Sequence, residues 1–185
     1  MILFPFYQDI EDKKFLVVGG GYTAAGKVGR LLQFTENIRV ISPQFSEPEK
    51  FARVTMVQKR FDESDLEGAD VVFAATNDHA LNMKIAALCK CRDLPVNVVD
   101  DPDACTFYMP SLVKRGQVTV SITTGGSSPA YAKLLRQQIE DLIPEDIDQI
   151  MEDMKQLREK LKDEVTDQKE RSRILRDELA GRLTD

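Results

Sequence analysis

Histidine and cysteine are scarce in this sequence. One histidine and three cysteines occur among its 185 residues. The odd number of cysteines favours reduced thiols over a disulfide framework. Cys89 and Cys91 stand two positions apart in a helix-like stretch, so their thiols point in different directions even though His79 is nearby. We therefore expect no metal site built from these residues and Cys105.

Long hydrophobic runs and an excess of basic residues are also missing. No apolar run approaches the roughly 20 residues that a membrane-spanning helix needs. The N-terminal segment has no basic start and soon becomes acidic, unlike a secretory signal. The net charge of −6 argues against a nucleic-acid binder, which needs a basic surface. We expect a cytoplasmic protein that binds neither membranes nor nucleic acid.

An alternation of strand-like and helix-like segments fills residues 14–100. The strand-like runs are apolar on both faces, which is typical of a parallel sheet covered by helices, so the expected fold class is α/β with a Rossmann-like sheet. The expected strands are Lys14–Val18, Ile38–Ile41, Val54–Gln58, Val71–Ala74 and Val96–Val99. The expected helices are Ala24–Phe34 and Ala80–Cys89, with a short turn at Glu63–Leu66.

The pattern changes after residue 100. Thr106–Val113 and Gln117–Thr123 are β-rich and could form a hairpin joined by residues 114–116. A helix is expected from Pro129 to about Leu142, with Ser128 as its N-cap. From residue 144 the chain is helical and highly charged, with two apolar stripes that indicate a solvated helical pair.

A glycine-rich turn joins the first strand to the first helix. Gly19, Gly21 and Ala24 spell G-x-G-x-x-A, the dinucleotide fingerprint. The first glycine permits the turn, the second lets backbone N–H groups approach a pyrophosphate, and the small third residue lets the helix pack on the sheet. Such turns also occur as simple tight connections. At the first strand–helix junction of this pattern, nucleotide binding is the favoured interpretation.

Polar residues follow the carboxyl ends of the other strands, where ligands of such sheets bind. Asp100 follows Val96–Val99 and is the candidate catalytic group; the same acidic sequence also suits an ordinary turn, and the residues alone leave the two readings equal. Since neighbouring extended side chains point to opposite sides, at most one of Asp100 and Asp101 should face a cleft. Thr76 is placed to touch a nucleotide, whereas Asn77 could do so or simply cap the next helix.

The end of the second strand bears on the choice of cofactor. NAD sites commonly have an acidic residue there for the ribose hydroxyls, but this strand ends at Ser42 and Pro43. Ser42 could offer a weaker hydrogen bond, and no arginine suggests a 2′-phosphate site, so NAD is preferred over NADP. The candidate cofactor-binding residues are Gly19, Gly21, Tyr22, Thr23, Ser42, Pro43, Thr76 and Asn77.

A second glycine-rich loop approaches the helix that starts at Pro129. Its residues Thr124, Gly125, Ser127 and Ser128 could hold a phosphate or a carboxylate through N–H groups, or could form no more than a flexible connection. Lys133 and Arg136 on the following helix would add positive charge if they face the same way.

Taken together, five motifs resemble those of the precorrin-2 dehydrogenase / sirohydrochlorin ferrochelatase family, the dehydrogenase–chelatase part of sirohaem synthases. The resemblance covers roughly residues 1–145 and is looser beyond them. The motifs are Phe15–Gly21 with Ala24 and Lys27, Ala75–Asp78, Asn97–Asp100, Phe107–Ser111 and Gly125–Pro129.

This resemblance implies an NAD-binding domain at 1–104, a dimerisation region at 105–143 and a C-terminal helical region at 144–185. It implies a homodimer that oxidises precorrin-2 to sirohydrochlorin with NAD, and in bifunctional members then inserts Fe(II) as a substrate to give sirohaem. Asp100 would act as the base in both steps. The loop from Thr124 to Ser128, with Lys114, Arg115 and Arg136, would dock the carboxylates of the tetrapyrrole.

The sequence departs from the family pattern in three ways. Thr124 stands where members often have serine, which retains a hydroxyl. The sequence shows no methyltransferase part, so we expect precorrin-2 to come from another protein. The helical tail ends at Asp185, earlier than in many members, so the resemblance supports the dehydrogenase step more strongly than the chelatase step. Two other functions are alternatives to this enzyme. One is a non-catalytic NAD-sensing module, which Asp100 and the second loop disfavour. The other is a chelatase without hydride transfer, which the intact glycine turn disfavours.

Overall fold

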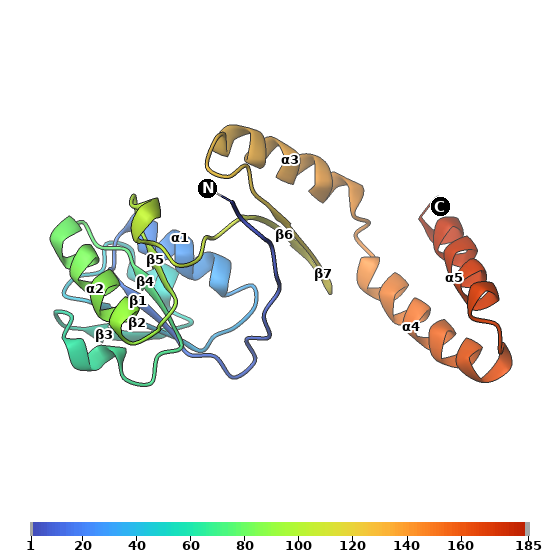
Figure 1. Ribbon diagram of the computed structural model, residues 1–185, viewed down its shortest axis with the longest axis horizontal. Helices are drawn as coiled ribbons and strands as arrows, with labels where there is room; N and C mark the ends of the chain where they lie inside the picture. Colours follow the sequence, from blue (N-terminus) through green and yellow to red (C-terminus); the bar gives the residue numbers. More distant parts are fainter. Residues whose placement is uncertain (1, 184–185) are drawn as a thin grey trace. The chain divides into compact units, whose positions relative to one another are not determined.

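A computed structural model describes residues 2–183 and divides them into two compact units. One unit comprises residues 4–109, and the other comprises residues 110–183 with Ile2 and Leu3. Figure 1 shows the elements of each unit. No helix within the described residues is both long enough and apolar enough to cross a membrane.

A five-stranded parallel sheet forms the first unit, in the order β3-β2-β1-β4-β5. Its strands are β1 (Phe15–Val18), β2 (Ile38–Ser42), β3 (Thr55–Gln58), β4 (Val71–Ala74) and β5 (Val96–Val98). Its helices are α1 (Tyr22–Leu31) and α2 (His79–Cys91), with short 3₁₀ helices η1 (Pro48–Phe51), η2 (Glu63–Leu66) and η3 (Pro102–Ala104). The Rossmann-like parallel sheet predicted from the sequence is confirmed.

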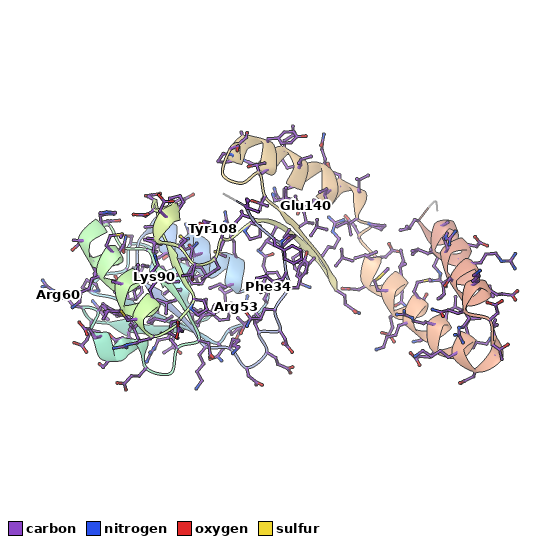
Figure 2. The ribbon with its side chains drawn as sticks, viewed as in Figure 1. Phe34, Arg53, Arg60, Lys90, Tyr108 and Glu140 are labelled. Atoms are coloured by element: carbon purple, nitrogen blue, oxygen red, sulfur yellow. The ribbon has the colours of Figure 1, made fainter. Side chains whose placement is uncertain are left out.

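Alternate residues of each central strand supply two separate cores, one on each face of the sheet. Phe15 and Val17 pack with α1 on one face, whereas Leu16 and Val18 pack with α2 on the other. This two-sided burial explains why β1 and β4 read as uninterrupted apolar runs. Charged side chains such as Arg53, Arg60 and Lys90 lie on the outside of the unit (Figure 2).

The second unit contains an antiparallel hairpin followed by three helices. The hairpin strands are β6 (Ser111–Arg115) and β7 (Val118–Ile122), and the helices are α3 (Pro129–Leu142), α4 (Ile147–Glu164) and α5 (Gln168–Arg182). The predicted bounds of α3 are confirmed, with Ser128 as N-cap and Pro129 at the first helical position. The two helices α4 and α5 pack against each other, as the apolar stripes indicated.

The hairpin begins later than the sequence suggested. Residues 106–110 were expected to be part of its first strand, but they lie outside the ladder, and Lys114 and Arg115 belong to β6 rather than to the turn. Thr106 instead pairs with Val96: its N–H donates to the Val96 carbonyl over 2.8 Å, and its hydroxyl accepts from the Val96 N–H. The Phe107 ring packs edge-on against Phe73 at 5.3 Å between centroids. These contacts bind the segment to the sheet unit.

Smaller differences affect the ends of other elements. The first helix runs over Tyr22–Leu31 rather than Ala24–Phe34, since the helix starts directly after Gly21. Val99 lies outside β5, although its N–H still donates to the Ala74 carbonyl over 2.9 Å. The boundaries placed at residues 104 and 143 stay predictions.

Candidate functional site

The loop between β1 and α1 is fixed by contacts with the ends of both neighbouring strands. Gly19 has a φ of +131°, and a Cβ there would overlap the backbone carbonyl of Ala75 after β4. At Gly20 a Cβ would overlap Ser42 and the Gln44 carbonyl after β2. The Gly19 N–H donates to the Ile41 carbonyl, and the Ser46 N–H donates to the Gly20 carbonyl, each over 2.9 Å. The loop therefore has one conformation for reasons of packing.

Gly21 differs from the other two glycines because nothing is packed against it. A Cβ at Gly21 would meet no atom within 4 Å, and its φ of −90° is ordinary for any residue. As N-cap of α1 it has no side chain to accept the first N–H groups of the helix. Ala24 is fully buried, as the fingerprint requires, while Tyr22 and Thr23 are exposed. Open space above an uncapped helix start fits a pyrophosphate.

The residues at the end of β2 form hydrogen bonds within the fold that the sequence did not indicate. Ser42 is buried, and its hydroxyl donates to the Gln44 carbonyl over 2.6 Å. This bond shapes the turn against which Gly20 packs. Pro43 is exposed, and its carbonyl accepts from the Gln58 side chain over 3.3 Å. Of this pair, Pro43 is the one that presents surface beside the glycine loop.

A buried amide organises the turn after β4. The Asn82 side chain of α2 accepts the Thr76 N–H over 3.1 Å, lies 2.7 Å from the Thr76 hydroxyl and donates to the Thr76 carbonyl over 3.0 Å. Thr76 is half-buried and Asn77 is exposed. Asp78 is the N-cap of α2, so the capping role weighed for Asn77 belongs to its neighbour. Sequence reasoning missed Asn82, since one asparagine within a helix gives no signal.

The two aspartates after β5 are separated by their conformations. Asp101 caps η3 by accepting the Ala104 N–H over 3.0 Å. Asp100 has a φ of +59°, a left-handed conformation that is uncommon for a residue with a side chain, and it is exposed. No hydrogen bond to its carboxylate occurs within residues 2–183. Asp101 thus acts as turn chemistry, and Asp100 is the carboxylate available for another partner.

A lysine of α1 lies between the glycine loop and the end of β5. The Lys27 ammonium donates to the Asn97 carbonyl oxygen Oδ1 over 2.6 Å and lies 5.5 Å from the Phe73 ring centroid. Burial lowers the pKa of Lys27, while the nearby Cys105 side chain raises it, Arg30 lowers it and Asp100 raises it. Lys27 was named in the first family motif, but its spacing in the helix indicated no particular role.

The second glycine loop belongs to the other unit and is closed by its own side chains. The Thr123 and Thr124 hydroxyls accept the N–H groups of Gly125 and Ser128, each over 3.1 Å. The Ser128 hydroxyl accepts the Tyr131 N–H over 3.2 Å as the cap of α3. The Ser127 side chain is exposed. The loop is therefore an ordered helix start, and its role in binding an anion stays a prediction.

All three basic residues assigned to this surface, Lys114, Arg115 and Arg136, have partners inside the unit. The Arg136 guanidinium pairs with Glu140 one turn later on α3 (Figure 2 labels Glu140). Arg115 donates to the Ile143 carbonyl. Lys114 contacts the Gly116 carbonyl in the hairpin turn. Lys133 is exposed on α3. This surface carries positive charge, but most of its basic side chains already contact groups of the same unit.

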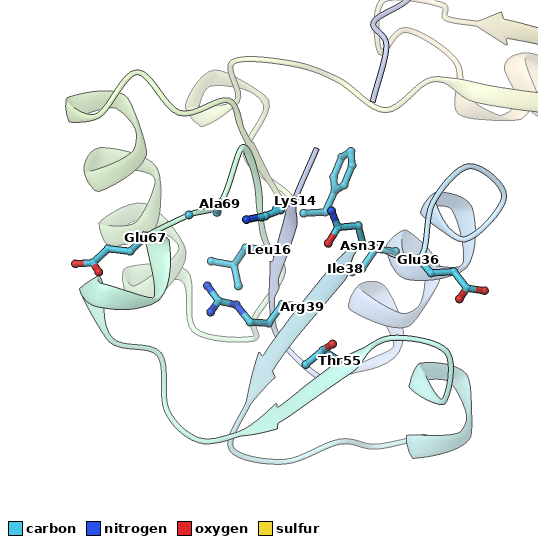
Figure 3. Close-up of a pocket in the computed structure, with 11 residues that line it drawn as sticks. Lys14, Leu16, Glu36, Asn37, Ile38, Arg39, Thr55, Glu67 and Ala69 are labelled. Carbon is cyan, nitrogen blue, oxygen red and sulfur yellow. The ribbon is translucent and has the colours of Figure 1, made fainter. Parts of the chain in front are cut away.

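Neither the cysteines nor the cavity found in the first unit indicates a second functional site there. Cys89 is fully buried, and burial raises its pKa to about 11, whereas Cys91 is exposed. No cluster of three His, Cys, Asp or Glu side chains suited to a metal occurs in the described part of the chain. A cavity of about 310 Å³ lies at the opposite edge of the sheet, where the strands begin (Figure 3). It is lined by charged and polar residues that include Lys14, Glu36, Arg39 and Thr55.

Comparison with known families assigns both units. Residues 6–111 match a family described as "Putative NAD(P)-binding", which covers more than half of the chain. Residues 115–142 match a family described as "Sirohaem biosynthesis protein central". The first unit is thus an NAD(P)-binding domain, in agreement with the glycine loop and its uncapped helix.

Curated relatives share these regions. The siroheme synthase of Thioalkalivibrio sulfidiphilus is 36% identical over 190 residues, covering 100% of this chain and 39% of that protein. The siroheme synthase of Nitrosomonas eutropha is 38% identical over 149 residues, covering 78% of this chain and 31% of that protein. The chain therefore spans less than half the length of these relatives.

A solved structure has the same fold. The structure titled "SirC, precorrin-2 dehydrogenase" superposes with a TM-score of 0.78 at 23% identity, covering 95% of this chain and 88% of that chain. A parallel sheet followed by a hairpin and C-terminal helices therefore also occurs in a solved structure.

Proposed function

Because this chain belongs to the precorrin-2 dehydrogenase / ferrochelatase family formed by the N-terminal part of sirohaem synthases, we propose that it oxidises precorrin-2 to sirohydrochlorin with NAD. The reaction removes two electrons and two protons from the macrocycle. NAD, when bound, takes up a hydride, and one proton is left for the protein to accept.

The observation that supports this proposal most directly is the placement of Asp100. It follows β5 at the carboxyl edge of the sheet, the same edge at which Gly19–Gly21 and Thr76 follow β1 and β4. Its carboxylate is exposed, and its charge acts on Lys27, which lies on the helix that the glycine loop begins. A carboxylate beside the nucleotide-binding loop can accept the proton as the hydride leaves.

NAD is proposed over NADP because of the residues after β2. A 2′-phosphate would call for an arginine in the segment from Ser42 to Gln44, and that segment has none. Ser42 is buried with its hydroxyl bonded to Gln44, so we expect the ribose to rest beside exposed Pro43 and backbone groups instead.

The tetrapyrrole is proposed to dock on the second glycine loop. Precorrin-2 has many carboxylates, and Ser127 offers an exposed hydroxyl beside the N-terminus of α3. Thr124, Gly125 and Ser128 would hold the loop in shape through the hydrogen bonds described above. Lys133 is the exposed lysine on α3 nearest to this loop in sequence.

We also propose that two copies of the chain form the working enzyme. Large apolar side chains are exposed in the N-terminal segment at Ile2, Phe4 and Phe6, and on α3 at Tyr131 and Leu134. Such exposure is typical of surfaces that another chain covers. The family resemblance indicates that the second chain is an identical one.

Insertion of Fe(II) into sirohydrochlorin is a second proposed activity, with iron as a substrate. It requires a base that removes the pyrrole protons, and the exposed Asp100 carboxylate is suited to that task as well.

A two-stage assay tests the proposal. Purified protein is given precorrin-2 with NAD or NADP, and NADH formation is followed together with the appearance of the sirohydrochlorin spectrum. Fe(II) or Co(II) is then added, and the metal-dependent spectral change is recorded. We expect NADH and sirohydrochlorin to form in equal amounts, faster with NAD than with NADP. Binding of NAD without any turnover would instead support an NAD-sensing module.

A further inference from the structure

The Lys27 ammonium is held inside the first unit in an environment that disfavours its charge. It is half-buried on α1 and lies near the Phe73 ring. Burial is the largest influence on its pKa and lowers it, while the neighbouring Cys105 and Asp100 side chains raise it by less. A lysine placed solely for stability would extend its ammonium into water, since its stem is long enough to do so. The buried position therefore calls for another explanation.

The hydrogen bond of the Lys27 ammonium leads to β5, the strand that Asp100 follows. Its acceptor is Asn97, a buried residue in the middle of β5. The Asn97 amide nitrogen donates in turn to the Phe107 carbonyl over 3.1 Å and lies 3.6 Å from the Cys105 sulfur. The Lys27 bond thus fixes which way the amide faces, because its oxygen points to the lysine and its nitrogen to the segment 105–107.

The residues joined by these contacts lie on both sides of Asp100 in the sequence. Asn97 and Val98 precede it, and Cys105 and Phe107 follow it. The Cys105 sulfur accepts the Val98 N–H over 3.1 Å and lies 3.3 Å from the Asp101 carbonyl. One network of hydrogen bonds therefore joins the residues before and after the loop in which Asp100 has its left-handed conformation.

We propose that Lys27 is a positioning residue for Asp100, acting through its hydrogen bond to Asn97 to hold the loop after β5. This inference deepens the proposed function. It predicts that the lysine is retained for activity rather than for stability.

Kinetics and thermal unfolding of variants separate this role from a structural one. In Lys27→Met we expect kcat to fall about 10²-fold, as small misplacements of a reacting group do, with little change in the KM for NAD. Its unfolding midpoint should change little, because removal of a half-buried charge opposes the loss of the hydrogen bond to the buried Asn97 oxygen. Lys27→Arg keeps a cation and a donor and should recover part of kcat.

Arg30→Met is the matched control, because it removes a cation from the same helix without touching Asn97. We expect wild-type kcat from it. If Lys27→Met retained wild-type kcat, or lost it only in proportion to a lower unfolding midpoint, the positioning role would be wrong.

Hydrogen exchange decides the case independently of turnover. In the chain without ligands, Lys27→Met should speed amide exchange in residues 97–107 and leave β1 and β2 unchanged, and Arg30→Met should alter neither region. Unchanged exchange in residues 97–107 would overturn the proposal. A wild-type protein without turnover would instead overturn the proposed function. The exchange experiment would then still test whether Lys27 holds residues 97–107 in place.

Discussion

At the scale of single residues, the three consecutive glycines serve different purposes. Gly19 and Gly20 leave room for the backbone after β4 and for the turn after β2, so they are constrained by the fold itself. Gly21 has an ordinary backbone conformation and open space beside it. We propose that a ligand occupies the open space at Gly21. This contrast gives a direct way to separate folding from binding.

The pair Gly21→Ala and Gly19→Ala tests this distinction. Gly21→Ala should change the free energy of unfolding by no more than about 0.5 kcal/mol, yet weaken NAD binding roughly tenfold or more, because its methyl group enters the ligand space. Gly19→Ala should be destabilised by about 1–3 kcal/mol through its φ and its overlap with Ala75. Thermal unfolding and calorimetric titration with NAD measure both effects. Unimpaired NAD binding by Gly21→Ala would contradict the assignment of the pyrophosphate position.

The sequence predicted some of these residues and could not predict others. Gly19, Gly21 and Asp100 are visible because they occupy fixed places relative to strand ends. Lys27 and Asn82 lie within helices, and their importance depends on a partner 70 residues away or on a buried turn. The family motifs include Lys27 and Asn97, but the contact between them arises only when α1 packs beside β5, so spacing along the chain does not indicate it.

At the scale of elements, the hairpin and the first helix of the tail are linked through one turn. The Gln117 N–H donates to Asp148 Oδ1 over 2.8 Å, and Gly116 has a φ of +52°. A Cβ at Gly116 would overlap the Asp148 carboxylate. Glycine is therefore required twice at this turn, by the backbone conformation and by the contact with α4.

Gly116→Ala should lower the free energy of unfolding by about 1–3 kcal/mol, from left-handed strain and the lost contact. Asp148→Ala should lower it by about 1 kcal/mol, through the loss of one hydrogen bond. Because the double variant has no overlap, its loss should be smaller than the sum of the two. Denaturant unfolding of all three variants supplies the comparison, and strict additivity would show that the turn and the helix are not coupled.

Elements of the sheet were predicted better than those after it. The strands β1 to β5 have apolar runs bounded by turns, and that pattern predicted a parallel sheet, although it did not predict the order of the strands. Residues 106–109 have the same β-rich composition, yet Thr106 pairs with Val96 and Phe107 packs on Phe73. Composition indicates an extended chain, but tertiary contacts decide which partner it finds.

At the scale of the whole molecule, the parallel sheet explains how the candidate site arises. Residues that follow β1, β2, β4 and β5 come from widely separated parts of the chain, and parallel strands bring them to one edge. The second unit supplies the loop proposed to bind the carboxylates of the tetrapyrrole. Its exposed apolar residues on α3 are proposed to meet a second copy.

Charge introduced on α3 tests the proposed dimer. Tyr131→Glu with Leu134→Glu places two carboxylates on its exposed apolar surface, where they would be buried without partners in a dimer. Light scattering should show a dimer for the wild type and a monomer for this variant. The variant should bind NAD normally but lose turnover. A wild-type protein that is monomeric at assay concentrations would contradict the proposal.

The most direct test of the account compares the wild type with Asp100→Asn in one experiment. Asparagine tolerates the left-handed backbone and has nearly the same shape, so the fold and NAD binding should persist. We predict one NADH per precorrin-2 consumed by the wild type and a rate about 10²- to 10⁴-fold lower in the variant. NADH formation by Asp100→Asn at the wild-type rate would contradict the proposed role of this carboxylate.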